Sequence, residues 1–146
     1  MKIIFLGTSG VHHPLIAAHI FLGRLHKPDF RFVRGFCDTY HDESGYPIFI
    51  DQDQDGNQVY TLGMGTETEV GYKSIKNLAD LVGYPEGELK LKTISIPGER
   101  LLYYAAKIPK IIGGQYVNQY LSSYLIGKEF SRIKEEVDEL RGGLTH

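Results

Sequence analysis

Cysteine is nearly absent from this chain of 146 residues, and neither sign of charge dominates. The single cysteine, Cys37, cannot form an internal disulfide, which is typical of proteins from reducing compartments. The formal net charge is -2 and the isoelectric point is near 6.3. This balance lacks the basic excess that marks proteins binding nucleic acid or membrane surfaces.

Long apolar runs are also lacking. The opening segment MKIIFLGTSG carries one lysine, and its apolar run stops at Gly7. That run is too short for the hydrophobic part of a signal peptide and far too short to span a bilayer. We therefore expect a cytoplasmic protein without membrane or nucleic-acid partners. The length and the 42% hydrophobic content suit one compact domain over residues 1–146.

Short apolar segments that alternate with helical patterns predict an α/β fold. Strands are expected at residues 2–6, 48–50, 58–62 and 89–96, where the second and third form a hairpin across the turn sequence DQDGN. Helices are expected at about 14–25, 67–82, 99–106 and 115–141, and residues 26–47 read as a long loop with at most one helical turn. The predicted fold is a mixed, mostly parallel sheet flanked by helices.

Apolar residues recur at every third or fourth position in the second half of the last predicted helix and form a seam along it. The seam consists of Ile126, Phe130, Ile133, Val137 and Leu140. This is the heptad spacing of a helix that packs along one stripe, although it lasts for only two heptads. We expect most of the seam to be buried, and a homodimer through this amphipathic C-terminal helix is one hypothesis.

Three predicted strands are each followed by a glycine turn and then a helix. The turns are Gly7-Thr8-Ser9-Gly10, Gly63-Met64-Gly65-Thr66 and Pro97-Gly98. If the strands are parallel, the turns meet at the carboxyl edge of the sheet, where open α/β folds bind ligands. Backbone N–H groups at glycines and at helix starts favour anions. The alternative is that these glycines serve only to make tight corners.

The first turn is not a Walker P-loop. Only two residues separate Gly7 from Gly10, and Val11-His12 stands where Lys-Ser/Thr would follow. No lysine is therefore placed for a γ-phosphate and no hydroxyl for magnesium, which argues against P-loop ATP hydrolysis.

Metal and cofactor sites are not expected. His12, His19 and His26 are seven residues apart, about 10 Å along a helix, which is too far to share one ion. The segment from Asp51 resembles a calcium loop, but Leu62 replaces its last ligand, and a hairpin turn is favoured. Cys37 lies beside Asp38, which argues against an activated thiolate.

The opening segment MKIIFLGTSGVHHPLIAAHIFLGRL resembles a family of small bacterial proteins, domain of unknown function 3189, found mostly in spore-forming Firmicutes and their relatives. The segments DQDGNQVYTLGMG and IGGQYVNQYLSSYLIGKEF are similar to two further motifs of that family, so the resemblance covers nearly the whole chain. The family usually has Gly-Gly-x-His at the first turn, where this chain has Ser9-Gly10-Val11-His12. The resemblance implies one α/β domain and no particular activity.

Three functions remain open. The first is a binding module for an anionic, nucleotide-like small molecule, with Arg100 as its cation. The second is a phosphoryl- or acyl-transfer enzyme in the same crevice, with His12 as acid or base. The third is an oligomeric interaction protein with a vestigial crevice. The candidate ligand-binding residues are Gly7, Thr8, Ser9, Gly10, His12, His13, Gly65, Thr66, Gly98 and Arg100.

Overall fold

The structure is a computed structural model that describes residues 1–42 and 45–145. These residues form one four-stranded sheet, six α-helices and one short 3-10 helix. In chain order the elements are β1 (Lys2–Gly7), α1 (His13–Phe21), α2 (Thr39–Asp42), β2 (Ile48–Gln52), β3 (Gln58–Gly63), α3 (Thr68–Leu81), β4 (Leu89–Thr93), α4 (Glu99–Ala105), η1 (Lys110–Ile112), α5 (Gly114–Lys128) and α6 (Phe130–Leu144).

The sheet has the strand order β2-β3-β1-β4, so β1 is central. It is parallel to both of its neighbours, β3 and β4, as the apolar run of residues 2–6 predicted. The pair β2–β3 is the predicted antiparallel hairpin, with one register shift between Phe49 and Asp51. The mixed, mostly parallel sheet expected from the sequence is therefore confirmed. Strand β4 ends earlier than expected, at Thr93, although Ile94 still donates a hydrogen bond to the Leu6 carbonyl (2.9 Å).

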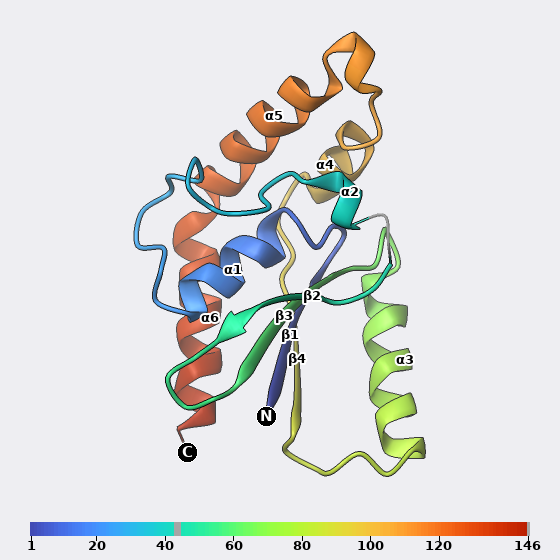
Figure 1. Ribbon diagram of the computed structural model, residues 1–146, viewed down its shortest axis with the longest axis vertical. Helices are drawn as coiled ribbons and strands as arrows, with labels where there is room; N and C mark the ends of the chain where they lie inside the picture. Colours follow the sequence, from blue (N-terminus) through green and yellow to red (C-terminus); the bar gives the residue numbers. More distant parts are fainter. Residues whose placement is uncertain (43–44, 146) are drawn as a thin grey trace.

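The main core lies between the sheet and a helical layer in which α1 packs against α6 (Figure 1). On the sheet side, Ile3, Phe5 and Val59 are fully buried. Helix α1 has almost no polar face, and Pro14 occupies its first turn, where a missing N–H costs nothing. Because β1 and α1 both contribute side chains to this core, packing fixes the chain on each side of the turn that joins them.

The C-terminal seam is buried as predicted, but it belongs to two helices. The chain turns at Glu129, so Ile126 ends the buried stripe of α5 and Phe130 begins that of α6. Phe130 meets Phe30 of the long loop with ring centroids 6.3 Å apart. The seam packs on its own chain. A homodimer, which stays a prediction, would have to use another face.

Helix α3 forms where it was predicted but presents a different side to the sheet. The residues nearest the sheet are small or half-buried, and the Cβ of any side chain at Gly71 would lie 2.0 Å from the Met64 methyl. The spacing of Val70, Ile75, Leu78, Leu81 and Val82 predicts one packed face, but all of these residues except the half-buried Ile75 are exposed. None of the described helices is long and apolar enough to cross a membrane.

The seam gives a stability prediction. Ile133 of α6 is fully buried in the core. Ile133→Ala should therefore lower the free energy of unfolding by about 2–4 kcal/mol, because apolar burial is lost and a cavity is left behind. Leu81→Ala is the matched control, because Leu81 is 84% exposed and its truncation should change stability by less than about 0.5 kcal/mol. Urea denaturation measures both. Equal effects would contradict this account of the core.

Candidate functional site

Two of the three glycine turns meet at the carboxyl edge of the sheet, as predicted. Gly7 and Gly63 are register partners at the ends of the parallel strands β1 and β3. The pairing continues beyond the strands, because Met64 donates to the Gly7 carbonyl (2.8 Å) and Gly65 to the Thr8 carbonyl (3.1 Å). The third turn follows β4, and there Gly98 begins α4 with a left-handed φ of 83° and faces Leu125 of α5.

A carboxylate of the chain itself occupies the junction between the first two turns. The main-chain N–H of Gly10 donates to Asp42 Oδ1 at 2.8 Å. A Cβ at Gly63 would lie 2.4 Å from the same oxygen, and one at Gly10 would lie 3.1 Å from it. Glycine is therefore needed at Gly63 to leave room for the carboxylate of α2, and a side chain at Gly10 would make a tight contact with it. The glycine pattern alone did not reveal this requirement.

A cavity of about 270 Å³ opens beside this junction. It is lined by residues from the ends of β1 and β3, from α2 and from α4: Thr8, Thr39, Asp42, Gly63, Gly65, Tyr103, Ala106 and Lys107. The Thr8 hydroxyl is buried and has no hydrogen-bond partner within the described residues. Lys107 Nζ lies 2.8 Å from the Tyr103 hydroxyl and over the same ring, 4.2 Å from its centroid. The cavity thus has one cation, one carboxylate and a buried hydroxyl, that of Thr8, without a partner among the described residues.

Sequence reasoning named some of these residues and missed others. Thr8 and Gly65, which were predicted, line the cavity. Gly10, also predicted, does not line it, but its N–H donates a hydrogen bond to Asp42, which does. Lys107, Tyr103, Thr39 and Asp42 were not predicted. The spacing between Tyr103 and Lys107 is one helical turn, the only sequence signal that could have paired them.

Eight of the ten predicted ligand-binding residues do not line this cavity: Gly7, Ser9, Gly10, His12, His13, Thr66, Gly98 and Arg100. Arg100 and Thr66 are exposed. Ser9 is buried, and its hydroxyl oxygen lies 3.4 Å from the N–H of Val11. Gly7 makes room for the helix, because a Cβ there would lie 2.4 Å from Pro14 Cγ. The steric alternative therefore accounts for this glycine.

His12 and His13, both expected to contact the anion, are fully buried. His12 Nε2 lies 2.8 Å from Asn118 Oδ1 of α5, which also accepts a hydrogen bond from Ser122. Burial lowers the pKa of His12 to about 4, with a further contribution from His13, so the ring is neutral at pH 7. This geometry gives no support to His12 as the acid or base of a transfer enzyme.

His13 lies beside a carboxylate at the start of α4. Its Nε2 is 3.2 Å from Glu99 Oε2, although neither atom makes a well-directed hydrogen bond. Burial would raise the pKa of Glu99, but contact with His13 and the hydrogen bond from Ser95 outweigh it and lower the pKa. The pair links the beginning of α1 to the beginning of α4.

Cys37 is buried and has the one positive φ among the described residues other than glycine, 61°. Its N–H donates to the Val11 carbonyl at 3.0 Å, which fixes the long loop to the first turn. Burial raises the pKa of the thiol to about 12, with a hydrogen bond to Ser122 opposing the shift. A thiol that stays protonated is a poor nucleophile, as the sequence indicated.

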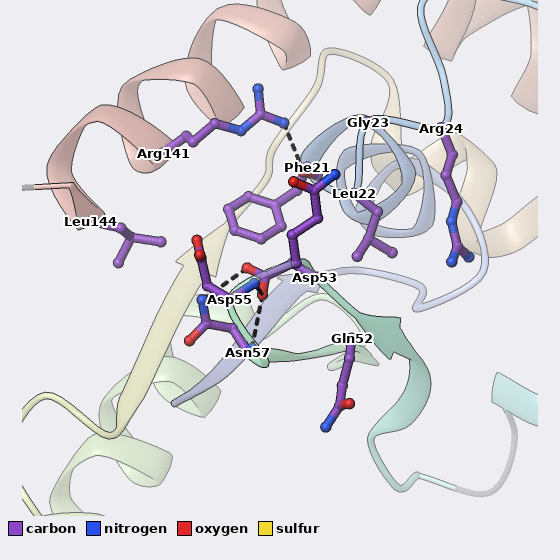
Figure 2. Close-up of a pocket in the computed structure, with 11 residues that line it drawn as sticks. Phe21, Leu22, Gly23, Arg24, Gln52, Asp53, Asp55, Asn57, Arg141 and Leu144 are labelled. Atoms are coloured by element: carbon purple, nitrogen blue, oxygen red, sulfur yellow. Dashed lines mark hydrogen bonds between the residues drawn. The ribbon is translucent and has the colours of Figure 1, made fainter.

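A different cavity, of about 590 Å³, lies at the opposite, amino edge of the sheet (Figure 2). Arg141 reaches across it and donates to the carbonyl of Phe21 (2.7 Å) at the end of α1. The Asp53 carboxylate accepts hydrogen bonds from the main chain of Asp55 and Asn57 and from the Asn57 amide, at 2.8–2.9 Å. The calcium-like segment is therefore a hairpin turn. No group of three or more potential metal ligands occurs within residues 1–42 and 45–145.

Gly63 gives a first test of the site geometry. Gly63→Ala should destabilise the protein by about 1–3 kcal/mol, because the new methyl group would overlap the Asp42 carboxylate and the Gly10 backbone. Gly142→Ala is the control, since nothing lies within 4 Å of a Cβ at this helical glycine. It should be neutral or stabilising by up to about 1 kcal/mol. Thermal unfolding measures the stability of both variants. Equal stabilities would contradict the close approach of Gly63 to the Asp42 carboxylate and the Gly10 backbone.

The buried His12 predicts a pH dependence. The unfolded chain protonates this residue near pH 6.5 and the folded chain near pH 4, so the unfolded state binds more protons between these values. The free energy of unfolding should therefore fall as pH drops through this window, by at most about 1.4 kcal/mol per pH unit from His12. Burial also lowers the pKa of His19, which acts in the same direction.

His12→Gln keeps a hydrogen-bond donor for Asn118 and removes the titrating ring, so it should flatten this pH dependence. His26→Gln, at an exposed position, should leave it unchanged. Urea unfolding between pH 7.5 and pH 4.5 measures the slope. An unaltered slope in His12→Gln would contradict the assignment.

The family comparison agrees with the resemblance noted in the sequence. The model of the family described as "Protein of unknown function (DUF3189)" matches residues 2–142, and the chain belongs to this family. No curated protein and no solved structure matches the chain.

Proposed function

We propose that this DUF3189 protein binds a small molecule through a phosphate or carboxylate group, in the cavity of about 270 Å³ at the carboxyl edge of its sheet. The cavity lies where parallel α/β sheets most often bind ligands. Its size suits one compact group, since sites for whole drug-sized molecules begin near about 300 Å³.

The observation that carries the proposal is the Gly10–Asp42 hydrogen bond. A turn whose N–H binds a carboxylate at 2.8 Å has the geometry and the polarity that an anion requires. In the structure, the Asp42 carboxylate is the anion that accepts the hydrogen bond from this turn. A ligand anion would approach the same turn from the cavity, and its charge would compete with that of Asp42.

Two further groups support an anionic ligand. Lys107 supplies the positive charge, and its stacking on Tyr103 limits the directions that the ammonium group can take. The Thr8 hydroxyl, buried without a partner, is free to donate one hydrogen bond. A buried hydroxyl without a partner is costly, and a ligand oxygen would remove that cost.

Lys107 gives the direct test. Lys107→Ala should weaken binding of inorganic phosphate about tenfold or more, because a charge-assisted contact contributes roughly 1.5–3 kcal/mol. Lys134→Ala is the matched control, an exposed lysine on α6 away from the cavity. Isothermal titration calorimetry measures both. The proposal fails if wild-type protein binds no phosphate, or if both variants bind it equally well.

Asp42 gives the opposite prediction. Asp42→Asn keeps an oxygen that can accept from Gly10 but removes the negative charge, so phosphate should bind about tenfold more tightly. Asp38→Asn, on the same loop but outside this cavity, is the control and should have a smaller effect. Unchanged or weaker phosphate binding in Asp42→Asn would contradict competition at the turn.

A further inference from the structure

Helix α5 carries three exposed tyrosines on one face. Tyr116, Tyr120 and Tyr124 are 79%, 73% and 60% exposed, and successive members are four residues apart, which places them on the same side of the helix. The buried residues Asn118 and Ser122 each lie two positions after a tyrosine, or about 200° around the helix axis. The tyrosines therefore point away from the core, on a helix whose beginning projects past the sheet at the top of Figure 1.

The 3-10 turn before α5 extends this apolar surface. Ile111 and Ile112 of η1 are 98% and 70% exposed, and Ile112 precedes Tyr116 by four residues. Aromatic side chains bury roughly 150–250 Å² each and isoleucine somewhat less, so these two isoleucines and the three tyrosines together expose on the order of 700 Å². The largest apolar patch on a typical monomer is about 300–600 Å². We call the five residues the tyrosine face, and its area is close to the roughly 800 Å² that each partner contributes to a stable complex.

The tyrosine face is uncharged. Residues 111–127 include no Asp, Glu, Lys, Arg or His, although charged residues make up 23% of the chain. A surface for nucleic acid would need basic side chains against the phosphates. In a two-fold dimer the same surface meets itself, so a charged group near the axis would be repelled by its own copy. Protein interfaces are enriched in aromatic residues and depleted of charge at their centre, so a second copy of the chain is the partner that fits this composition.

We infer that the tyrosine face is the contact between two copies of this chain, related by a two-fold axis. Residues spaced by four form the ridges that interdigitate in the commonest class of helix packing, in which the two axes cross at about −50°. Tyr120 is the middle residue of the stripe, so it would lie at the crossing point, beside Tyr120 of the partner subunit. This contact leaves the C-terminal seam in the core of its own chain, where the structure has it.

Sedimentation velocity at protein concentrations up to about 100 µM should show a dimer, since interfaces of this area bind at micromolar concentrations or below. Tyr120→Glu should weaken the association about a hundredfold or more, because each dimer loses two central tyrosines and gains a repulsion. Leu81→Glu is the matched control, at an exposed apolar position on α3, and should leave the dimer intact. Circular dichroism should show all three proteins equally folded, because both positions are exposed.

A monomeric wild-type protein would overturn the inference and leave the tyrosine face to a partner of another kind. A dimer that Tyr120→Glu does not weaken would overturn it too, because that dimer would use another face. Weakening by Leu81→Glu to the same extent would have the same meaning.

A mixture of Tyr120→Glu and Tyr120→Lys tests the two-fold arrangement. Each variant alone brings like charges together at the axis, whereas the mixture brings opposite charges together. The equimolar mixture should therefore associate about tenfold or more tightly than either variant alone, because like charges at an interface are strongly unfavourable. A mixture of Leu81→Glu and Leu81→Lys is the control and should sediment as its components do. Equal association of the Tyr120 mixture and its components would overturn the two-fold contact through this face.

Discussion

The parallel pairing of β1 with both β3 and β4 determines where every candidate binding group lies. Because Gly7 and Gly63 are register partners, the two turns that follow them leave the sheet at the same level and stay hydrogen-bonded for two more residues. The backbones at Gly10 and Gly63 then come so close that a Cβ at Gly63 would lie 2.8 Å from the Gly10 nitrogen, and one at Gly10 would lie 3.0 Å from the Gly63 nitrogen. The remaining space holds one carboxylate oxygen, and this requirement positions α2 and the end of the long loop.

Most of the fold could be predicted because local signals and packing agree. The apolar β1, the hairpin turn and the helix boundaries at Pro14 and Gly98 all follow from residue chemistry that acts over a few positions. Two features did not follow. The helical pattern runs through Glu129 without a breaker, and the turn there depends on where α5 and α6 find their partners. The packed side of α3 places Gly71 against the Met64 side chain, while most of the apolar residues of this helix stay exposed.

The site could be predicted only in part, because it depends on contacts between distant segments. Sequence order suggested Arg100 as the cation, since it follows the third turn directly. The chain instead places the start of α4 against α5, through Gly98 and Leu125, and brings the end of α4 back to Gly65. Lys107, two helical turns beyond Arg100, therefore faces the cavity. Asp42 could not have been found at all, because its partner Gly10 is 32 residues away.

The buried polar atoms without partners point to the same edge. Among the described residues these atoms belong to Thr8, His12, His13, Thr61 and Glu99, which lie at the ends of β1 and β3 or at the starts of the helices beside them. Folded proteins satisfy nearly all buried polar groups, so a concentration at one place requires a reason. Packing alone would scatter such atoms through the core. Among these atoms, the Thr8 hydroxyl lies at the cavity of about 270 Å³ beside the backbone-bound carboxylate, whereas His12, His13 and Glu99 do not line that cavity. Of the buried polar atoms at this edge, the Thr8 hydroxyl is therefore the one that bears on the proposed ligand.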